Sequence, residues 1–160
     1  MNEDIQNPAN QMRRPIKRGA LRTAFHAAGM RLTRQRLAIW RELEGRFDHP
    51  DVDHLYRAVK PRIPQISLFT VYRTMNALEA AEMVKRVTTW KGHARYDGNV
   101  EAHTHFLCEK CGRIDDVVSQ EDCRELLAHA VGCVKGHVRR VDVMVRGECE
   151  VCAGKAALPG

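Results

Sequence analysis

The sequence lacks any long apolar run and any apolar segment at its start. No stretch among its 160 residues approaches the ~18 consecutive apolar residues of a membrane helix. The opening MNEDIQNPANQMRRPIKRG contains no apolar core of the kind that a secretory signal peptide needs. We therefore expect a cytoplasmic protein with no membrane segment. Because cytoplasmic thiols stay reduced, its cysteines are expected to bind metal rather than to form disulfides.

The second half also lacks the excess of positive charge that the first half carries. Residues 1–86 contain 16 Lys and Arg against 9 Asp and Glu, whereas residues 87–160 contain 10 against 11. Basic charge gathered in one part of a chain indicates contact with phosphate. We expect the first half to bind nucleic acid and the second to have another role, although a merely solvated basic face would give the same counts.

Apolar periodicity predicts an α+β protein in which a helical N-terminal part precedes a small α/β domain. Residues 1–18 are polar and are expected to form a flexible basic arm, with a cluster of Arg13, Arg14, Lys17 and Arg18. Helical patterns follow at residues 21–30, 33–43 and 51–60, and Thr33 is the expected N-cap of the second.

The helix expected after Ser67 has an apolar face and a polar face. The positions expected to face the core are Leu68, Val71, Met75 and Leu78. The opposite face carries side chains suited to the major groove of DNA: Phe69, Tyr72, Arg73 and Asn76. Arginine pairs with guanine and asparagine with adenine. An ordinary amphipathic helix with an exposed tyrosine is the alternative, and this segment alone favours neither.

A basic hairpin is predicted after this helix. Val84–Thr89 and Ala94–Asp97 resemble short strands, joined by a turn at residues 91–92. Helices followed by such a hairpin form a winged helix-turn-helix. Three hairpin residues are placed to lie along phosphate: Lys85, Arg86 and Lys91. The order of these elements favours DNA binding.

Two Cys-x-x-Cys pairs stand in the second half, Cys108/Cys111 and Cys149/Cys152. Four thiolates form a closed tetrahedral zinc site, which here would join segments separated by 37 residues. Thiol redox chemistry is the alternative, but the pairs lack the βαβ setting of a thioredoxin-like motif. Two further cysteines are expected to be buried apolar residues: Cys123 and Cys133.

The residues around the first cysteine pair also include harder metal ligands, histidines and aspartates. His103 and His105 point to one side if they lie on a strand, and Asp97 and Asp116 flank them. Nitrogen and oxygen donors suit Fe(II), Mn(II) or Zn(II), and they do not usually bind the same ion as four thiolates. We therefore expect a second, exchangeable metal ion beside the structural zinc.

Strands are predicted at residues 103–108, 112–118 and 137–149, with a helix near 121–131. The last strand alternates well, and its edge is available for pairing with a second chain. A dimer would match a palindromic DNA site.

With these motifs the sequence resembles the ferric uptake regulator family of metal-dependent bacterial repressors. The resemblance covers about Leu21 to Lys155, and its motifs stand in the family's order: GMRLTRQRLAI, HPDVDHLY, SLFTVYRTMNALEAAEMV, ARYD, HTHFLCEKCGRIDD and GECEVC. It implies a winged-helix DNA-binding domain at residues 19–97, a hinge at 98–102 and a metal-binding dimerisation domain at 103–160. It also implies a homodimer on palindromic double-stranded DNA, and we add Arg31 and Lys91 to the expected DNA contacts.

The resemblance also implies which residues bind which metal. The structural Zn(II) would be held by Cys108, Cys111, Cys149 and Cys152. A regulatory Fe(II) or Mn(II) would be held by His49, Asp97, His103, His105 and Asp116. Because His49 lies in the DNA-binding half, this metal would tie the domains together and favour the DNA-competent arrangement.

The three histidines and two aspartates look most like the peroxide-responsive members, which carry Asp at the position of Asp116 where iron-responsive members typically carry Glu. In those members bound Fe(II) reacts with hydrogen peroxide and a ligand histidine is oxidised; the matching residues are His49 and His103. An iron-responsive repressor is the alternative. A zinc-responsive one is disfavoured because residues 87–102 contain no cysteine.

Two enzyme-like alternatives lie outside this family, a zinc hydrolase and a thiol-redox protein. A hydrolase needs a general base and a cleft, and no spare glutamate or nucleophile stands beside the histidines, so we expect no enzyme. The sequence also departs from many family members, which have a histidine on the last strand where this chain has Arg140 and Val141. The nearest histidine, His137, is shifted, so a further metal site there is not expected.

Overall fold

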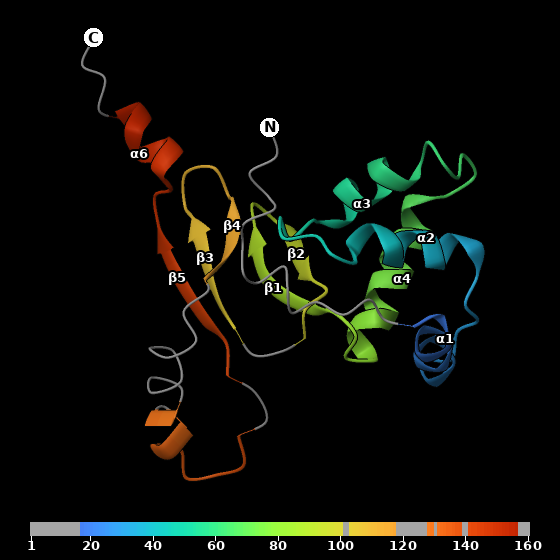
Figure 1. Cartoon of the computed structure of the whole chain (residues 1–160), viewed down its shortest axis with the longest axis horizontal. Helices are drawn as coiled ribbons and strands as arrows, with labels where there is room; N and C mark the ends of the chain where they lie inside the picture. Colours follow the sequence, from blue (N-terminus) through green and yellow to red (C-terminus); the bar gives the residue numbers. More distant parts are fainter. Residues whose placement is uncertain (1–16, 101–102, 118–127, 130, 139–140, 157–160) are drawn as a thin grey trace. The chain divides into compact units, whose positions relative to one another are not determined.

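The computed structural model describes residues 17–100, 103–117, 128–129, 131–138 and 141–156. The chain divides into two compact units, Met1–Val100 and Glu101–Gly160. The first combines helices with a two-stranded hairpin, and the second is built on a three-stranded sheet (Figure 1). The predicted α+β class is confirmed. Most of the predicted arm and residues 101–102 of the expected hinge lie outside the described residues, and the predicted domain boundaries stay predictions.

The described part of the first unit contains four helices, and three of them, all but the first, begin at side-chain caps. The four are α1 (Arg18–Ala27), α2 (Arg34–Leu43), α3 (Val52–Val59) and α4 (Leu68–Ala80). Thr33 accepts a hydrogen bond from the Arg36 amide at 3.3 Å, which confirms it as the cap of α2. Asp51 caps α3 and Ser67 caps α4 in the same way. These caps satisfy amide groups that lack a partner within the helix.

The apolar faces of these helices form one core. Its largest fully buried side chains include Phe25, Ile39, Leu43, Leu55, Met75 and Leu78. Three of the four predicted core positions of α4 are buried, but Leu68 is 37% exposed and that prediction is wrong. Leu68 is the first residue of α4, and burial on this face of the helix begins one turn later, at Val71.

The hairpin consists of β1 (Lys85–Trp90) and β2 (His93–Asp97), which pair antiparallel as predicted. Lys91 and Gly92 between them have φ values of 48° and 84°. Two positive φ values are what a two-residue type I′ hairpin turn requires. Arg86 of β1, which was expected to lie along phosphate, donates to Glu79 of α4 at 2.9 Å and so joins the hairpin to that helix.

The sheet of the second unit has the order β4-β3-β5. Its strands are β3 (Thr104–Cys108), β4 (Ile114–Val117) and β5 (Val143–Gly147). β3 pairs antiparallel with β4 and parallel with β5. The strand predicted at 137–149 is shorter than expected, and α6 (Glu150–Ala156) follows it where no helix was predicted. Most of the helix predicted near 121–131 lies outside the described residues. Within the described ranges, no helix is long and apolar enough to cross a membrane.

Candidate metal centres and DNA-binding surface

The two Cys-x-x-Cys pairs meet at one end of the sheet. Cys108 is the last residue of β3 and lies opposite Gly147 of β5, two residues before Cys149. Gly112 closes the first turn with φ of 76°, and its amide donates to the Cys108 carbonyl at 2.8 Å. Parallel pairing of β3 with β5 therefore brings together cysteines that are far apart in the sequence.

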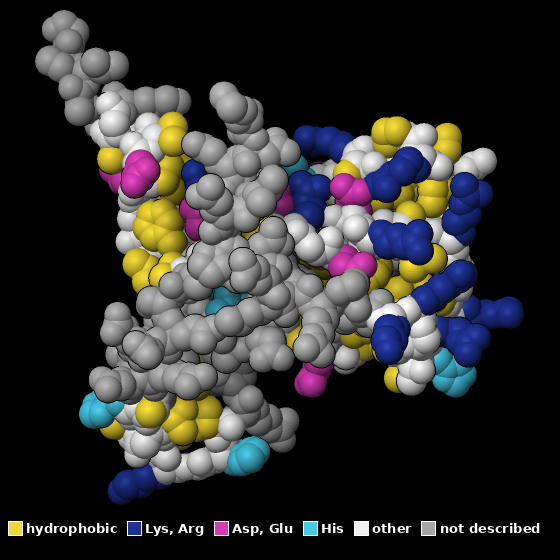
Figure 2. Space-filling model, in the orientation of Figure 1, with side chains coloured by type: hydrophobic (Ala, Val, Ile, Leu, Met, Phe, Trp, Pro, Cys, Tyr) yellow, Lys and Arg dark blue, Asp and Glu magenta, His cyan; other side chains and the backbone are white. Residues whose placement is uncertain are grey.

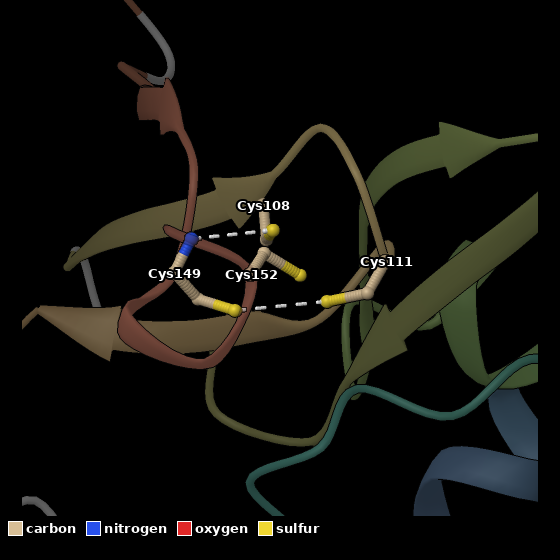
Figure 3. A group of neighbouring side chains, drawn as sticks. All are labelled: Cys108, Cys111, Cys149 and Cys152. Carbon is tan, nitrogen blue, oxygen red and sulfur yellow. Dashed lines mark hydrogen bonds between the residues drawn. The ribbon is translucent and has the colours of Figure 1, made fainter. Parts of the chain in front are cut away.

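The four sulfur atoms point toward a common centre (Figure 3). Their ligand atoms all lie within 4.8 Å of one another, and the Sγ atoms of Cys111 and Cys149 are 3.8 Å apart. A tetrahedron with Zn–S bonds of about 2.3 Å has an edge of about 3.8 Å. All four residues are free thiols. The spacing and the donor type both fit a zinc ion.

The thiols of this cluster differ in acidity. Hydrogen bonds from the backbone amides of Cys111 and Cys149 lower the pKa of Cys108 to about 6. The Cys149 amide lies 3.3 Å from the Cys108 sulfur (Figure 3). Hydrogen bonding with the Cys149 side chain, followed by burial, raises the pKa of Cys152 to about 12. A divalent cation lets these closely spaced thiols ionise together, because its positive charge offsets the repulsion between the thiolates.

The two cysteines outside the pairs were predicted to be buried. Cys133 is exposed, so that prediction is wrong for this residue. It follows a short helical turn in which its amide donates to the His129 carbonyl at 3.2 Å, and the residues around it are exposed as well. Cys123 lies outside the described residues.

Three of the predicted nitrogen and oxygen ligands meet within the second unit. Asp116 on β4 lies opposite His105 on β3. Its Oδ1 atom is 3.3 Å from Nε2 of His103 and 3.8 Å from Nε2 of His105. The two imidazole rings lie with centroids 4.3 Å apart. Two imidazoles and a carboxylate in this arrangement are a donor set for Fe(II), Mn(II) or Zn(II).

The other two predicted ligands form a buried pair within the first unit. Nε2 of His49 lies 3.7 Å from Oδ2 of Asp97, and their side chains are only 1% and 0% exposed. His49 precedes α3 and has φ of 47°, while Asp97 ends β2. Sequence reasoning missed one neighbour of this pair, Arg95, which donates to the carbonyls of Asp48 and His49. It stands in the ARYD motif two residues before Asp97, yet nothing in its spacing marks those contacts.

The predicted DNA-reading side chains share the exposed face of α4. Phe69 is 68% and Tyr72 43% exposed, and Arg73 and Asn76 are exposed with them. The Arg73 guanidinium lies 5.8 Å from the centre of the Phe69 ring, a cation–π distance that holds it against the helix. Two further predicted contacts are also exposed: Arg31 and Lys91. Figure 2 shows Lys and Arg side chains spread over the helices of this unit.

Comparison with known proteins agrees with these features. The ferric uptake regulator family matches residues 27–139. The peroxide-responsive repressor PerR of Staphylococcus epidermidis is 34% identical over 131 residues, which cover 81% of this chain and 85% of that protein. PerR of Staphylococcus aureus is 33% identical over 134 residues, covering 82% and 88%.

Solved structures share the fold. The Helicobacter pylori ferric uptake regulator Fur superposes with a TM-score of 0.72 at 21% identity, covering 84% of this chain and 90% of that one. A Campylobacter jejuni peroxide stress regulator gives 0.65 at 29% identity, covering 86% and 100%. A zinc-bound manganese uptake regulator gives 0.58 at 31% identity, covering 79% and 97%.

Proposed function

The chain belongs to the ferric uptake regulator family, and from this membership we propose that it is a homodimeric, metal-dependent transcriptional repressor that senses hydrogen peroxide. The observation that carries the proposal is the presence of two chemically distinct donor sets. Four thiols meet in the second unit, and histidines paired with aspartates stand apart from them in both units. Soft and hard donors select different ions.

The thiols hold a structural Zn(II), and the hard donors hold one regulatory Fe(II) or Mn(II). We assign the regulatory ion to His49 and Asp97 of the first unit together with His103, His105 and Asp116 of the second. An ion shared in this way joins the DNA-binding unit to the other unit. It therefore favours one arrangement of the two, because a ligand shifts the equilibrium toward the state that binds it better.

Peroxide sensing follows from what the ligands can undergo. Bound Fe(II) supplies the redox chemistry that activates hydrogen peroxide. The ring of His49 or His103 then gains an oxygen atom, so that imidazole and hydrogen peroxide give an oxygenated ring and water. The altered ring binds metal poorly, the units are no longer held together, and DNA is released. The peroxide-responsive relatives and the aspartate at position 116 support this assignment over an iron-responsive repressor.

DNA is read by the exposed face of α4. Arg73 and Asn76 supply the base contacts, while Arg31 and Lys91 supply phosphate contacts that fix the register. A homodimer presents two such helices and therefore favours a palindromic operator. The exposure of these side chains and the basic surface of the first unit support this assignment.

The test begins with duplexes selected from a random DNA library by the Mn(II)-loaded protein. Binding to a selected duplex is then measured for Fe(II)-loaded and Mn(II)-loaded protein before and after a low dose of peroxide. Peptide masses are read from the same samples. We expect only the Fe(II) form to release DNA, with one oxygen atom added at His49 or His103.

Two results would contradict parts of this proposal. If both metal forms stay bound and neither histidine gains mass, the protein is a metal-responsive repressor without peroxide sensing. If no duplex is selected in the presence of metal, metal-dependent repression itself is wrong.

A further inference from the structure

The loop that carries His49 is hydrogen-bonded to β2 through three successive backbone carbonyls, those of Asp48, His49 and Pro50. The Arg95 guanidinium donates to the carbonyl of His49 and, at 2.6 Å, to the carbonyl of Asp48. The neighbouring amide of Tyr96 donates to the Pro50 carbonyl at 3.1 Å. The next residue of β2 is Asp97. The strand that holds the loop therefore ends in the carboxylate that the loop's histidine faces.

The backbone of His49 needs such an external hold. Its φ of 47° lies in the left-handed region, which residues other than glycine adopt unfavourably. Such a conformation persists where several contacts with the surrounding structure hold it in place, and it occurs most often at functional sites. Here the carbonyls of Asp48, His49 and Pro50 all accept hydrogen bonds from β2.

Arginine is the side chain suited to this contact. Its guanidinium presents several N–H groups in a rigid plane, so one side chain bridges two carbonyls without bending the loop. Arg95 is half-buried, and Thr88 lies opposite it on β1 next to a β-bulge, the register shift between Arg86 and Thr88. Bulges re-aim neighbouring side chains and are common beside functional sites.

We propose that Arg95 is a positioning residue that holds His49 in its metal-binding conformation and thereby sets both the affinity of the regulatory site and the ease with which His49 is oxidised. This inference rests on the proposed function, since it concerns the same site. In this assignment Arg95 is not itself a metal ligand and acts on His49 through the backbone of the loop, to whose Asp48 and His49 carbonyls it donates. Groups that orient metal ligands in this way typically account for about 10- to 100-fold in metal affinity.

A second arginine in the same loop provides a matched control. Arg46 forms a two-pronged ion pair with the Asp48 side chain, with N–O distances of 2.8 and 2.6 Å, and also contacts Glu42. This pair joins two side chains of the loop, whereas Arg95 bonds to the loop's carbonyls. Because surface ion pairs contribute little, Arg46→Met should change metal affinity by less than about fivefold.

The experiment compares full-length wild type, Arg95→Met, Arg95→Lys and Arg46→Met. Mn(II) dissociation constants are measured on zinc-loaded protein, and zinc content and far-UV circular dichroism report the fold. Arg95→Met should weaken Mn(II) binding about 10- to 100-fold with zinc content unchanged. Arg95→Lys should lie between, because an ammonium is a point donor that lacks the planar fork.

Two readouts separate positioning from a general structural role. In Fe(II)-loaded protein given limiting peroxide, Arg95→Met should lower the share of added oxygen found on His49 relative to His103. In a His49→Ala background, Arg95→Met should add little further loss of Mn(II) affinity, because the ligand through which Arg95 acts is gone. A residue that merely supports the fold would cost the same in both backgrounds.

Equal losses in Arg95→Met and Arg46→Met, or full additivity with His49→Ala, would overturn the inference. If Arg95→Met fails to fold, the oxidation ratio and the Mn(II) affinity of Arg95→Lys decide, and wild-type values there would overturn it as well. Failure of the proposed function gives a different result, because wild type itself would then bind no Mn(II) at the histidines.

Discussion

The two donor sets of this chain differ in where their members come from. The four clustered cysteines belong to the second unit, at the end of β3, in the turn after it, just after β5 and in α6. The hard donors are divided, with His49 and Asp97 in the first unit and the other three in the second. A ligand set within one unit can stabilise only that unit. Under the proposed function, one ion bound by the divided set would make the arrangement of the two units depend on that ion, which is what a sensor requires.

The largest effect should follow from breaking the cysteine set. In Cys111→Ser a hydroxyl replaces one thiolate, and the affinity for zinc should fall by several orders of magnitude, because binding free energy and folding free energy are coupled at such sites. The apolar core of the second unit is small within the described residues, and two of its buried members, Cys108 and Cys149, belong to the cluster itself. We expect the variant to lose zinc and the folded second unit, measured by metal analysis and circular dichroism.

Cys133→Ser is the control for this experiment. Cys133 is exposed and separate from the cluster, so its loss should leave zinc content and folding unchanged. A Cys111→Ser protein that kept its zinc and its circular dichroism spectrum would show that the thiols do not form one structural site.

A second, smaller effect should follow from breaking the divided set. Asp97→Ala removes a carboxylate that is buried beside His49. DNA affinity in the presence of Mn(II) should fall toward the metal-free level, a loss of about 5- to 150-fold if the coupling is typical of allosteric proteins. Zinc content should not change. Fluorescence anisotropy of a labelled duplex, with and without Mn(II), measures the effect.

Asp53→Ala serves as the control, because Asp53 is a partly exposed aspartate of the same unit that pairs with an exposed histidine, His93, at 3.4 Å. It should keep the response to Mn(II). Should Asp97→Ala respond to Mn(II) as wild type does, the regulatory site would not include the first unit, and the contrast between the two donor sets would fail.

How much of this could be predicted from sequence depends on how local the signal is. Thr33 and Ser67 mark helix starts because a cap acts within three residues. The two cysteine pairs predict a zinc site because chelation from a turn fixes the spacing of the two cysteines in each pair. His49 has no such local pattern, and only the family resemblance pointed to it.

What sequence reasoning missed depends on contacts between distant residues. Leu68 fits the apolar stripe of α4 but lies at the helix start, before burial on this face begins. Cys133 belongs to a residue type that is usually buried, yet its surroundings leave it exposed. Arg95 binds carbonyls 46 and 47 residues away, and such backbone contacts leave no mark on the identity of their partners.

A change on the DNA-reading face should affect neither donor set. Arg73→Ala removes an exposed guanidinium from α4, and loss of one base contact typically costs about 1–3 kcal/mol of DNA-binding free energy. Base preference at one operator position should relax, as read by binding to single-substitution duplexes. Zinc content and Mn(II) affinity should match wild type. An equal loss on all duplexes, without relaxed preference, would make Arg73 a phosphate contact instead.

The smallest effect is expected from a substitution that alters the divided set of hard donors without removing a ligand. Asp116→Glu keeps a carboxylate but adds one methylene where Oδ1 of Asp116 lies 3.3 Å from Nε2 of His103 and 3.8 Å from Nε2 of His105. The ligand type is unchanged, so Mn(II)-dependent DNA binding should weaken by less than about tenfold. The longer side chain shifts the carboxylate relative to both imidazoles and so changes the arrangement of ligands on which the proposed oxidation of His103 depends. Peptide masses after peroxide treatment of the Fe(II) form should therefore show less oxygen on His103 than in wild type. If oxidation proceeds as fast in the glutamate variant, the identity of this acid does not determine peroxide sensing, and the choice between peroxide and iron must lie in other residues of the site.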